Sequence, residues 1–179
     1  MAKMTAVDLV MLTACFVCQI QDGQTSYLSY KKPAYAYSVK YGTDTTGVTD
    51  GNDYALYGEW CYHSDGKSSN EWVRVDLQKE YNVTSVTVIN RASTYKQATE
   101  RLANTDIRIS FETEIGSGQM CGNLVTYAQT ETSPIIDFTC LEGIRGRHVI
   151  LMLQNMVNYM NFCEIRVYSE DSPDISKCF

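Results

Sequence analysis

Short runs of alternating apolar and polar residues, separated by turns, make up most of this chain after Glu71. The runs WVRVDL at 72–77 and IRISF at 107–111 alternate as half-buried strands do, and VTSVTVI at 83–89 is rich in β-branched residues. Further runs of this kind lie at 124–127, 135–138, 148–153 and 162–168. Turn sequences such as Ser64-Asp65-Gly66 separate the runs, and no stretch has sustained helical periodicity. The pattern predicts one all-β domain, an antiparallel sandwich or barrel.

Residues 1–22 have the pattern of a secretory signal peptide. Lys3 supplies the positive charge and residues 9–18 supply the apolar core, with cleavage expected between Cys18 and Ser26. The apolar core is too short to span a bilayer. The alternative is that it forms a buried strand of the mature domain. We expect a secreted protein that does not span a membrane, with its domain at 27–169 and a solvated tail at 170–179.

Secretion would affect how many of the seven cysteines the mature chain keeps and whether they form disulfide bonds. Cys15 and Cys18 would leave with the signal peptide. Five cysteines would remain in the mature chain: Cys61, Cys121, Cys140, Cys163 and Cys178. In an oxidising compartment they predict two disulfide bonds and one odd thiol. No remaining pair has C-x-x-C spacing, which argues against a metal site built on thiolates.

Charge and motifs exclude several functional classes. The formal net charge of −6, without a Lys/Arg cluster, argues against a nucleic-acid partner. Neither a G-x-S-x-G nor an H-E-x-x-H motif is present, and nothing singles out a catalytic pair among the 21 acidic residues. Of the two histidines, His148 lies in an apolar run that favours a structural role, and His63 lies in a loop, where histidines are usually solvated. We do not expect an enzyme.

A series of short motifs runs from about Lys31 to Tyr168. The motifs, in order, are Lys32-Pro33-Ala34, Val48-Thr49-Asp50-Gly51-Asn52, WVRVDL at 72–77, Asn90-Arg91, Glu100-Arg101 and Cys163-Glu164. Together they resemble the F-type lectins, fucose-binding lectins typified by eel fucolectin. Each motif is weak alone, and their order makes them specific. The resemblance implies an antiparallel β-sandwich jelly roll of the discoidin (F5/8 type C) kind.

The resemblance also implies a sugar site. The family reads fucose with one histidine and two arginines, which correspond here to His63, Arg91 and Arg101, while Leu56 and Tyr57 correspond to the wall that receives the sugar methyl group. Guanidinium groups suit sugar oxygens because they donate fixed, charge-assisted hydrogen bonds. This chain departs from the pattern: Ser93 replaces the family's aspartate, the loop before Arg101 is about three residues longer, and the adjacent-cysteine pair is replaced near Thr94-Tyr95.

A structural calcium ion is the second site that the resemblance implies. Its ligands would be the side chains of Asp50, Asn52 and Glu164 and the backbone carbonyls of Gly47, Trp60 and Cys163. Such oxygens are what calcium prefers. The implied disulfides are Cys61–Cys163, which would hold Trp60 and Glu164 in one cage, and Cys121–Cys140. Cys178 would remain free or link two chains.

We therefore expect a secreted, calcium-stabilised lectin that recognises L-fucose-like terminal sugars on fucosylated glycans, with roles in cell adhesion or innate immunity. Several weak sites must act together for useful avidity, so a homo-oligomer is expected. The alternative is an adhesion or structural module of the same fold that has lost the sugar site, and Ser93 and the longer loop favour it.

Overall fold

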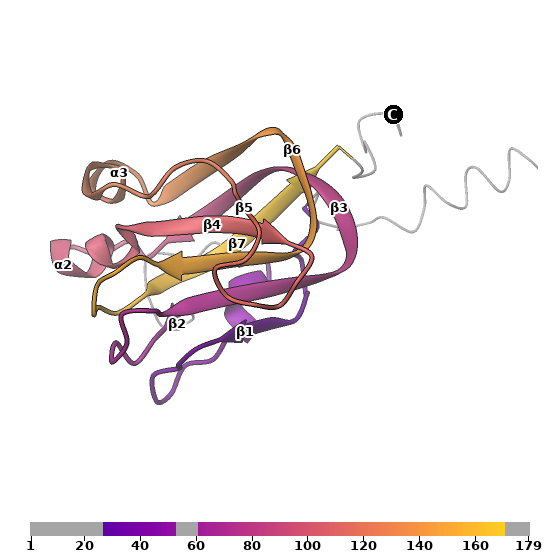
Figure 1. The fold of residues 1–179 in the computed structure, drawn as a ribbon. Coiled ribbons are helices and arrows are strands. Elements are labelled where there is room, and N and C mark those ends of the chain that lie inside the picture. The colour runs from indigo at the N-terminus through magenta and orange to yellow at the C-terminus, as the bar shows by residue number, and fades with distance from the viewer. Residues whose placement is uncertain (1–26, 53–60, 171–179) are drawn as a thin grey trace, which may run out of the picture. The chain divides into compact units, whose positions relative to one another are not determined.

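The computed structural model describes residues 27–52 and 61–170, which belong to one compact unit. Seven strands form an antiparallel sheet in the order β2-β7-β3-β6-β4-β5, with β1 paired to β3 (Figure 1). The strands are β1 (Ala34–Ala36), β2 (Tyr62–His63), β3 (Trp72–Asn90), β4 (Thr105–Ser110), β5 (Gln119–Met120), β6 (Ile135–Leu153) and β7 (Asn161–Ser169). The helical segments are η2 (Thr46–Thr49), α2 (Lys96–Thr99), η3 (Glu100–Leu102) and α3 (Tyr127–Thr132).

The two long strands β3 and β6, each of 19 residues, fold this sheet into a sandwich. The first part of β3 pairs with β1 and with the end of β6, whereas its last part pairs with β7 and with the start of β6. Both strands curve from one layer into the other (Figure 1). Alternate residues of both layers point inward, so valines, isoleucines and leucines fill the space between them. The predicted fold class, an antiparallel β-sandwich, is confirmed.

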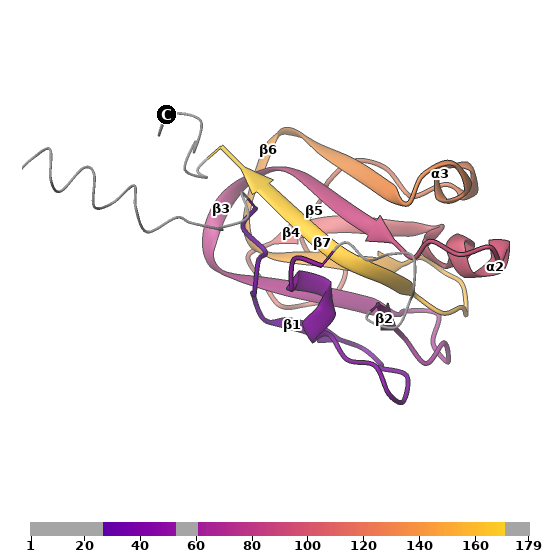
Figure 2. The same cartoon turned by 180° about the vertical axis from the view of Figure 1, so that it is seen from behind.

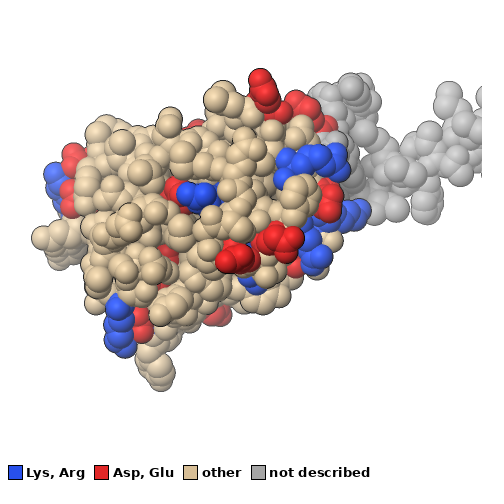
Figure 3. All heavy atoms as spheres, in the orientation of Figure 1, with Lys and Arg blue, Asp and Glu red and all other residues tan. Residues whose placement is uncertain are grey.

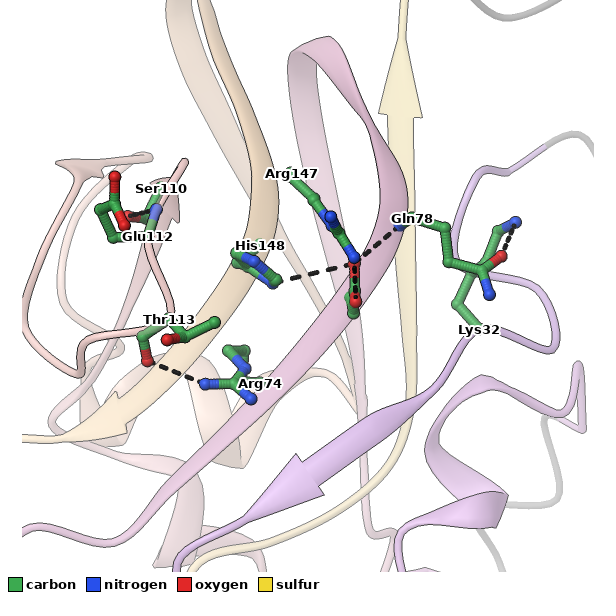
Figure 4. Close-up of polar contacts among 9 residues, drawn as sticks. Lys32, Arg74, Gln78, Ser110, Glu112, Thr113, Arg147 and His148 are labelled. Atoms are coloured by element: carbon green, nitrogen blue, oxygen red, sulfur yellow. Dashed lines mark hydrogen bonds and ion pairs between the residues drawn. The ribbon is translucent and has the colours of Figure 1, made fainter.

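Asp76 fixes the place where β3 bends. The β3–β6 register breaks between Asp76 and Tyr81, and Gln78 adopts a left-handed backbone conformation with φ 67°. The Asp76 carboxylate accepts a hydrogen bond from Gln78 N at 2.8 Å and two from Arg147 at 2.7 and 2.8 Å (Figure 4). Those bonds hold the pKa of Asp76 down, to about 2, with the Arg147 bonds the largest cause. A carboxylate that stays ionised thus braces the bend.

The structure differs from the sequence prediction at the ends and junctions of strands. The runs at 72–77 and 83–89 belong to one strand, because β3 continues through the polar residues between them. The predicted strand at 124–127 is wrong, because Thr126 caps the start of α3. The Thr126 side chain accepts a hydrogen bond from Gln129 N, and the Gln129 side chain accepts one from Thr126 N, which forms a capping box. The predicted signal peptide at 1–22 lies outside the described residues, as does the predicted tail beyond residue 170.

Two disulfide bonds are present, Cys61–Cys163 and Cys121–Cys140, which is the pairing that the family resemblance implies. Cys61 directly precedes β2 and Cys121 directly follows β5, so each disulfide adjoins one end of the strand order. On the face drawn in Figure 3, basic and acidic side chains are scattered and most of the surface is uncharged. No helix in the described part of the chain is long and apolar enough to cross a membrane.

Candidate functional site: a basic cluster and a buried carboxylate

His63 is held at the end of the short strand β2. Tyr62 pairs with Phe162 and His63 with Asn161 of β7. Ser64 extends this pairing, because its backbone N donates to Met160 O at 2.9 Å and its Oγ accepts from Met160 N at 2.8 Å. The imidazole is only 6% exposed. His63 is therefore a fixed, nearly buried side chain rather than a solvated loop residue.

The partners of the imidazole determine its protonation. His63 Nδ1 lies 2.6 Å from Ser64 O, and Nε2 lies 2.8 Å from Arg101 Nη1. A carbonyl can only accept and a guanidinium can only donate, so Nδ1 carries the proton and Nε2 accepts from Arg101. Burial lowers the pKa of His63, and the charges of Lys40, Arg101 and Arg91 lower it further. The hydrogen bond to Ser64 raises this pKa but does not outweigh the other effects. The ring is neutral near pH 7.

Arg101 reaches His63 because the longer loop is folded. The segment after Arg91 forms α2 and η3, and η3 carries Arg101 back to the histidine. Its guanidinium Cζ lies 4.9 Å from the centre of the Tyr159 ring. Burial lowers the pKa of Arg101, and the charge of Arg91 lowers it as well. The longer loop therefore does not separate Arg101 from His63.

Arg91 completes the cluster from the end of β3. The preceding residue, Asn90, is fully buried and donates from Nδ2 to Thr99 O at 2.9 Å, which ties the end of β3 to α2. Arg91 Nε is buried and has no hydrogen-bond partner among the described residues. Ser93 supplies no carboxylate; its Oγ accepts from Tyr95 N at 3.1 Å and forms the turn into α2. The structure thus brings His63, Arg91 and Arg101 together, while Leu56 and Tyr57 lie outside the described residues.

Tyr159 belongs to this cluster and was missed by sequence reasoning. Its ring meets the His63 ring edge-on at a centroid distance of 5.0 Å and lies beneath Arg101. Gly66, with φ 71°, makes room for it, since a Cβ there would lie 2.4 Å from the Tyr159 ring. Tyr159 is 39% exposed, so part of the ring faces solvent. It lies in the irregular β6–β7 connection, where no local motif pointed to it.

A buried carboxylate marks the second predicted site. Glu164 is fully buried; its Oε1 accepts from the Tyr27 hydroxyl at 3.0 Å and its Oε2 from Gly51 N at 3.4 Å. Burial raises the pKa of Glu164 to about 7, and the nearby charge of Asp50 raises it too, although the hydrogen bonds oppose this. A buried carboxyl group and an exposed one that repel each other are suited to a cation between them.

The surroundings of Glu164 supply further oxygens. Seen from behind, the violet turn η2 lies against β7, which carries Glu164 (Figure 2). Gly47, Asp50 and Cys61 line one pocket of about 300 Å³, and the disulfide joins Cys61 to Cys163. In the described part of the chain, no three His, Cys, Asp or Glu side chains form a metal cluster. An ion here would need backbone and amide oxygens besides the carboxylates, and such a set of hard oxygens fits calcium.

The remaining predicted calcium ligands are less well defined. Asn52 N donates to Asp50 Oδ1 at 2.8 Å, which closes the turn through Gly51. Gly51 has φ 89°, and a Cβ there would lie 2.9 Å from the Tyr30 ring, so this turn requires glycine. Trp60 lies outside the described residues.

The second histidine lies in a different part of the sandwich. His148 is 5% exposed, and its Nδ1 lies 3.9 Å from Asp76 Oδ1, too far for a hydrogen bond (Figure 4). Ser110 is its neighbour in the β4–β6 register, but Ser110 Oγ is 2.8 Å from Ser117 Oγ and accepts from Glu112 N. Burial lowers the pKa of His148. The serine, histidine and aspartate do not form a charge relay in this arrangement, and His148 packs beside the brace at the β3 bend.

Comparison with known proteins gives a consistent result. Residues 47–151 match a family model described as a NedA-like, galactose-binding domain. Fucolectin-6 of Anguilla japonica is 33% identical over 125 residues, which cover 68% of this chain and 61% of that protein. Fucolectin of Anguilla anguilla is 30% identical over 128 residues, which cover 70% of this chain and 76% of that protein. The chain thus spans less than two thirds of Fucolectin-6.

Solved structures agree on the fold. A fucolectin from the serum of striped bass, Morone saxatilis, superposes with a TM-score of 0.68 at 24% identity, over 82% of this chain and 48% of that one. The lectin domain of lectinolysin, solved in complex with the Lewis b antigen, has a TM-score of 0.66 at 24% identity, over 83% of this chain and 99% of that one. The β-sandwich is therefore of the discoidin-like kind that these carbohydrate-binding domains share.

Proposed function

The chain belongs to the F-type lectin family, and on that premise we propose that it binds terminal L-fucose-like sugars of glycans through His63, Arg91 and Arg101. The observation that carries the proposal is the convergence of these three side chains, which come from β2, the end of β3 and η3. Burial lowers the pKa values of His63 and Arg101, and the neighbouring positive charges lower them further. Perturbed groups of this kind cluster at functional sites.

The chemistry of the cluster suits a neutral sugar. Arg91 Nε is a buried donor that has no partner among residues 27–52 and 61–170, and Arg101 has donors beyond the one used by His63. Sugar hydroxyl and ring oxygens can accept from such guanidinium groups, and the fixed planar fork gives directional selectivity. The half-exposed face of Tyr159 offers an apolar surface for sugar C–H groups.

The folded loop weakens the case for a module that has lost its sugar site. A longer loop can carry its last residues away from a site, but here α2 and η3 return Arg101 to His63. The replacement of aspartate by Ser93 remains a difference from the family, because Arg91 has no carboxylate supplied from that position. We therefore favour the lectin over the sugar-blind module.

A titration tests the proposal. Calorimetry with methyl α-L-fucoside should give saturable binding, whereas methyl β-D-galactoside at the same concentrations should give none, because the site is proposed to recognise the fucose methyl group and hydroxyl pattern. His63→Ala should remove the fucoside signal in a protein that still unfolds cooperatively. A glycan array then identifies the preferred linkage. A folded wild-type protein that binds no fucosylated glycan would instead establish the sugar-blind module.

The affinity for the fucoside should fall when the pH is lowered. The folded-state pKa of His63 lies below the ordinary value of about 6.5, so the neutral ring persists near neutrality. As pH falls through that lowered pKa, a protonated His63 can no longer accept from Arg101 and adds a charge facing Lys40, Arg91 and Arg101. We expect constant affinity from pH 8 to 7 and a loss below about 6.5. Stronger binding on acidification would contradict the assigned tautomer.

We further propose that the domain is secreted, that it acts as a homo-oligomer, and that a calcium ion binds at Glu164. Asp50, Asn52 and Glu164 would hold the ion with the carbonyls of Gly47, Trp60 and Cys163. The ion would supply positive charge where two carboxyl groups now repel each other. Its role would be to join η2, β7 and the segment before β2. The two disulfides are consistent with an oxidising compartment.

Chelation tests the calcium proposal through stability. An ion present at about 100 times its dissociation constant stabilises the folded state by roughly 2.7 kcal/mol, so EDTA should lower the melting temperature by on the order of 5–10 °C. Added calcium should restore it. In Glu164→Gln the shift should vanish, whereas Glu114→Gln, on the exposed segment before β5, should keep it. Identical wild-type melting curves in EDTA and in calcium would rule out the site.

A further inference from the structure

The chain contains one sequence of the form N-x-S/T, Asn82-Val83-Thr84, to which neither the sugar site nor the calcium site gives a role. Such a sequence is an acceptor for an N-linked glycan on the surface of a secreted protein. Val83 is fully buried, whereas Asn82 and Thr84 on either side of it are half-buried. The two side chains that define the acceptor thus reach the surface, and the residue between them anchors the strand in the core.

The strand β3 is irregular at this sequence. Val83 pairs with Ile144 of β6 and Ser85 with Thr139, so two steps along β3 correspond to five along β6. Thr84 has no partner in this register, nor in the register of β3 with β7, among the strands that the structure describes. An extra residue of this kind forms a β-bulge, which bends the strand and interrupts the ladder. The acceptor sequence therefore lies at a bulge next to the bend of β3 rather than inside a regular sheet face.

The carboxamide of Asn82 lies over a glycine of the opposite strand. A Cβ at Gly143 would lie 2.6 Å from both Nδ2 and Oδ1 of Asn82, so the glycine leaves the room that this side chain occupies. Asn82 Nδ2 donates to Glu170 Oε2 at 3.4 Å, in an exposed bond that is longer than usual. An amide nitrogen has two hydrogens, and a glycosylated one keeps one of them. A glycan on Nδ2 is thus compatible with the contact to Glu170.

The acceptor lies far from the basic cluster. Asn82 precedes Asn90, the last residue of β3, by eight positions, which corresponds to roughly 25 Å along an extended strand. The bend of β3 and helix α2 lie at opposite ends of the sandwich (Figure 1). A glycan on Asn82 would therefore leave His63, Arg91 and Arg101 open to a ligand.

We propose that Asn82 carries an N-linked glycan. The inference rests on the proposed secretion, because the glycan is added in the secretory pathway. The donor is an oligosaccharide joined to a lipid through pyrophosphate. The bond from C1 of its first sugar to the pyrophosphate oxygen breaks, C1 bonds to Asn82 Nδ2, Nδ2 gives up one proton, and the lipid pyrophosphate leaves. The Thr84 hydroxyl is the second group that the transfer requires.

Expression of the full chain in mammalian cells tests the inference. The protein from the medium should contain a larger species, and peptide-N-glycosidase F should remove the difference and convert Asn82 to an aspartate in a peptide map. The enzyme should act on the folded protein, because the acceptor reaches the surface. Asn82→Gln and Thr84→Ala, which each destroy the acceptor sequence, should lose the glycan. Thr84→Ser should keep it, because serine retains the hydroxyl group.

Asn123→Gln is the matched control, since Asn123 is exposed and has a valine two positions later. It should keep the glycan. A second form of the chain, placed behind an established signal peptide, separates the two ways of failing. If this form reaches the medium without a glycan on Asn82, the inference is overturned. If only this form is secreted and it carries the glycan, the proposed secretion is refuted and the acceptor site stands.

Discussion

Arg101→Ala should weaken fucose binding at least tenfold and leave the fold intact. Arg101 is the one side chain of the cluster that contacts both His63, at 2.8 Å, and the Tyr159 ring, at 4.9 Å. Hydrogen bonds from a charged donor contribute about 1.5–3 kcal/mol each, so loss of one or two should weaken binding by a factor of roughly 10–20,000. Calorimetry with methyl α-L-fucoside measures the effect, and the melting curve reports the fold.

Two further variants sharpen the result. Arg101→Lys keeps the charge but lacks the planar fork that donates to His63 while stacking on Tyr159, so it should recover little of the affinity. Arg145→Ala removes an exposed arginine of β6 outside the cluster and should bind like the wild type. If Arg101→Ala bound fucose within threefold of the wild type, Arg101 would not belong to the sugar site, and the longer loop would have only a structural role.

The second large effect is on stability. Replacing both Cys61 and Cys163 with alanine opens a cross-link between residues 102 positions apart, whereas Cys121 and Cys140 are 19 apart. The loop-entropy relation gives about 4.7 kcal/mol for the first pair and about 3 kcal/mol for the second. Urea unfolding at 25 °C should therefore show the larger loss of unfolding free energy for the Cys61/Cys163 double variant.

The two double variants also differ in function. Cys61 directly precedes β2, so loss of its disulfide frees the strand that carries His63 and should weaken fucose binding too. The Cys121/Cys140 variant should keep the wild-type affinity, because its disulfide lies next to β5. Equal stability losses, or a sugar affinity indifferent to the Cys61–Cys163 bond, would contradict the proposed anchoring.

The strands could be predicted from sequence where side chains alternate, and not where polar residues continue a strand. The run at 83–89 is rich in β-branched residues and buried on one face, and both features are visible in the local sequence. The bend of β3 depends on Asp76 contacting Arg147, 71 residues away, so no local window contains its cause. At 124–127 the apolar residues suggested a strand, but the capping box of Thr126 and Gln129 decides for α3.

The sequence indicated which residues form the candidate site, but it did not indicate how the chain brings them together. Motif order pointed to His63, Arg91 and Arg101, but helix α2, four residues long, has no periodicity by which to foresee it. Its formation is what returns Arg101 to His63. Tyr159 was missed because its role arises from space left by Gly66, a residue 93 positions earlier in the chain, and such a contact exists only after folding.

The strand order ends in β2 and β5, each of two residues, and a disulfide adjoins each of them. Exposed edge strands offer unpaired backbone groups to other chains and so template aggregation, which short edges limit. With both disulfide bonds intact, β2 and β5 are held in place, and each covers the edge of the longer strand beside it. Reduction should therefore leave the two end strands less firmly attached and the longer strands beside them more open to other chains.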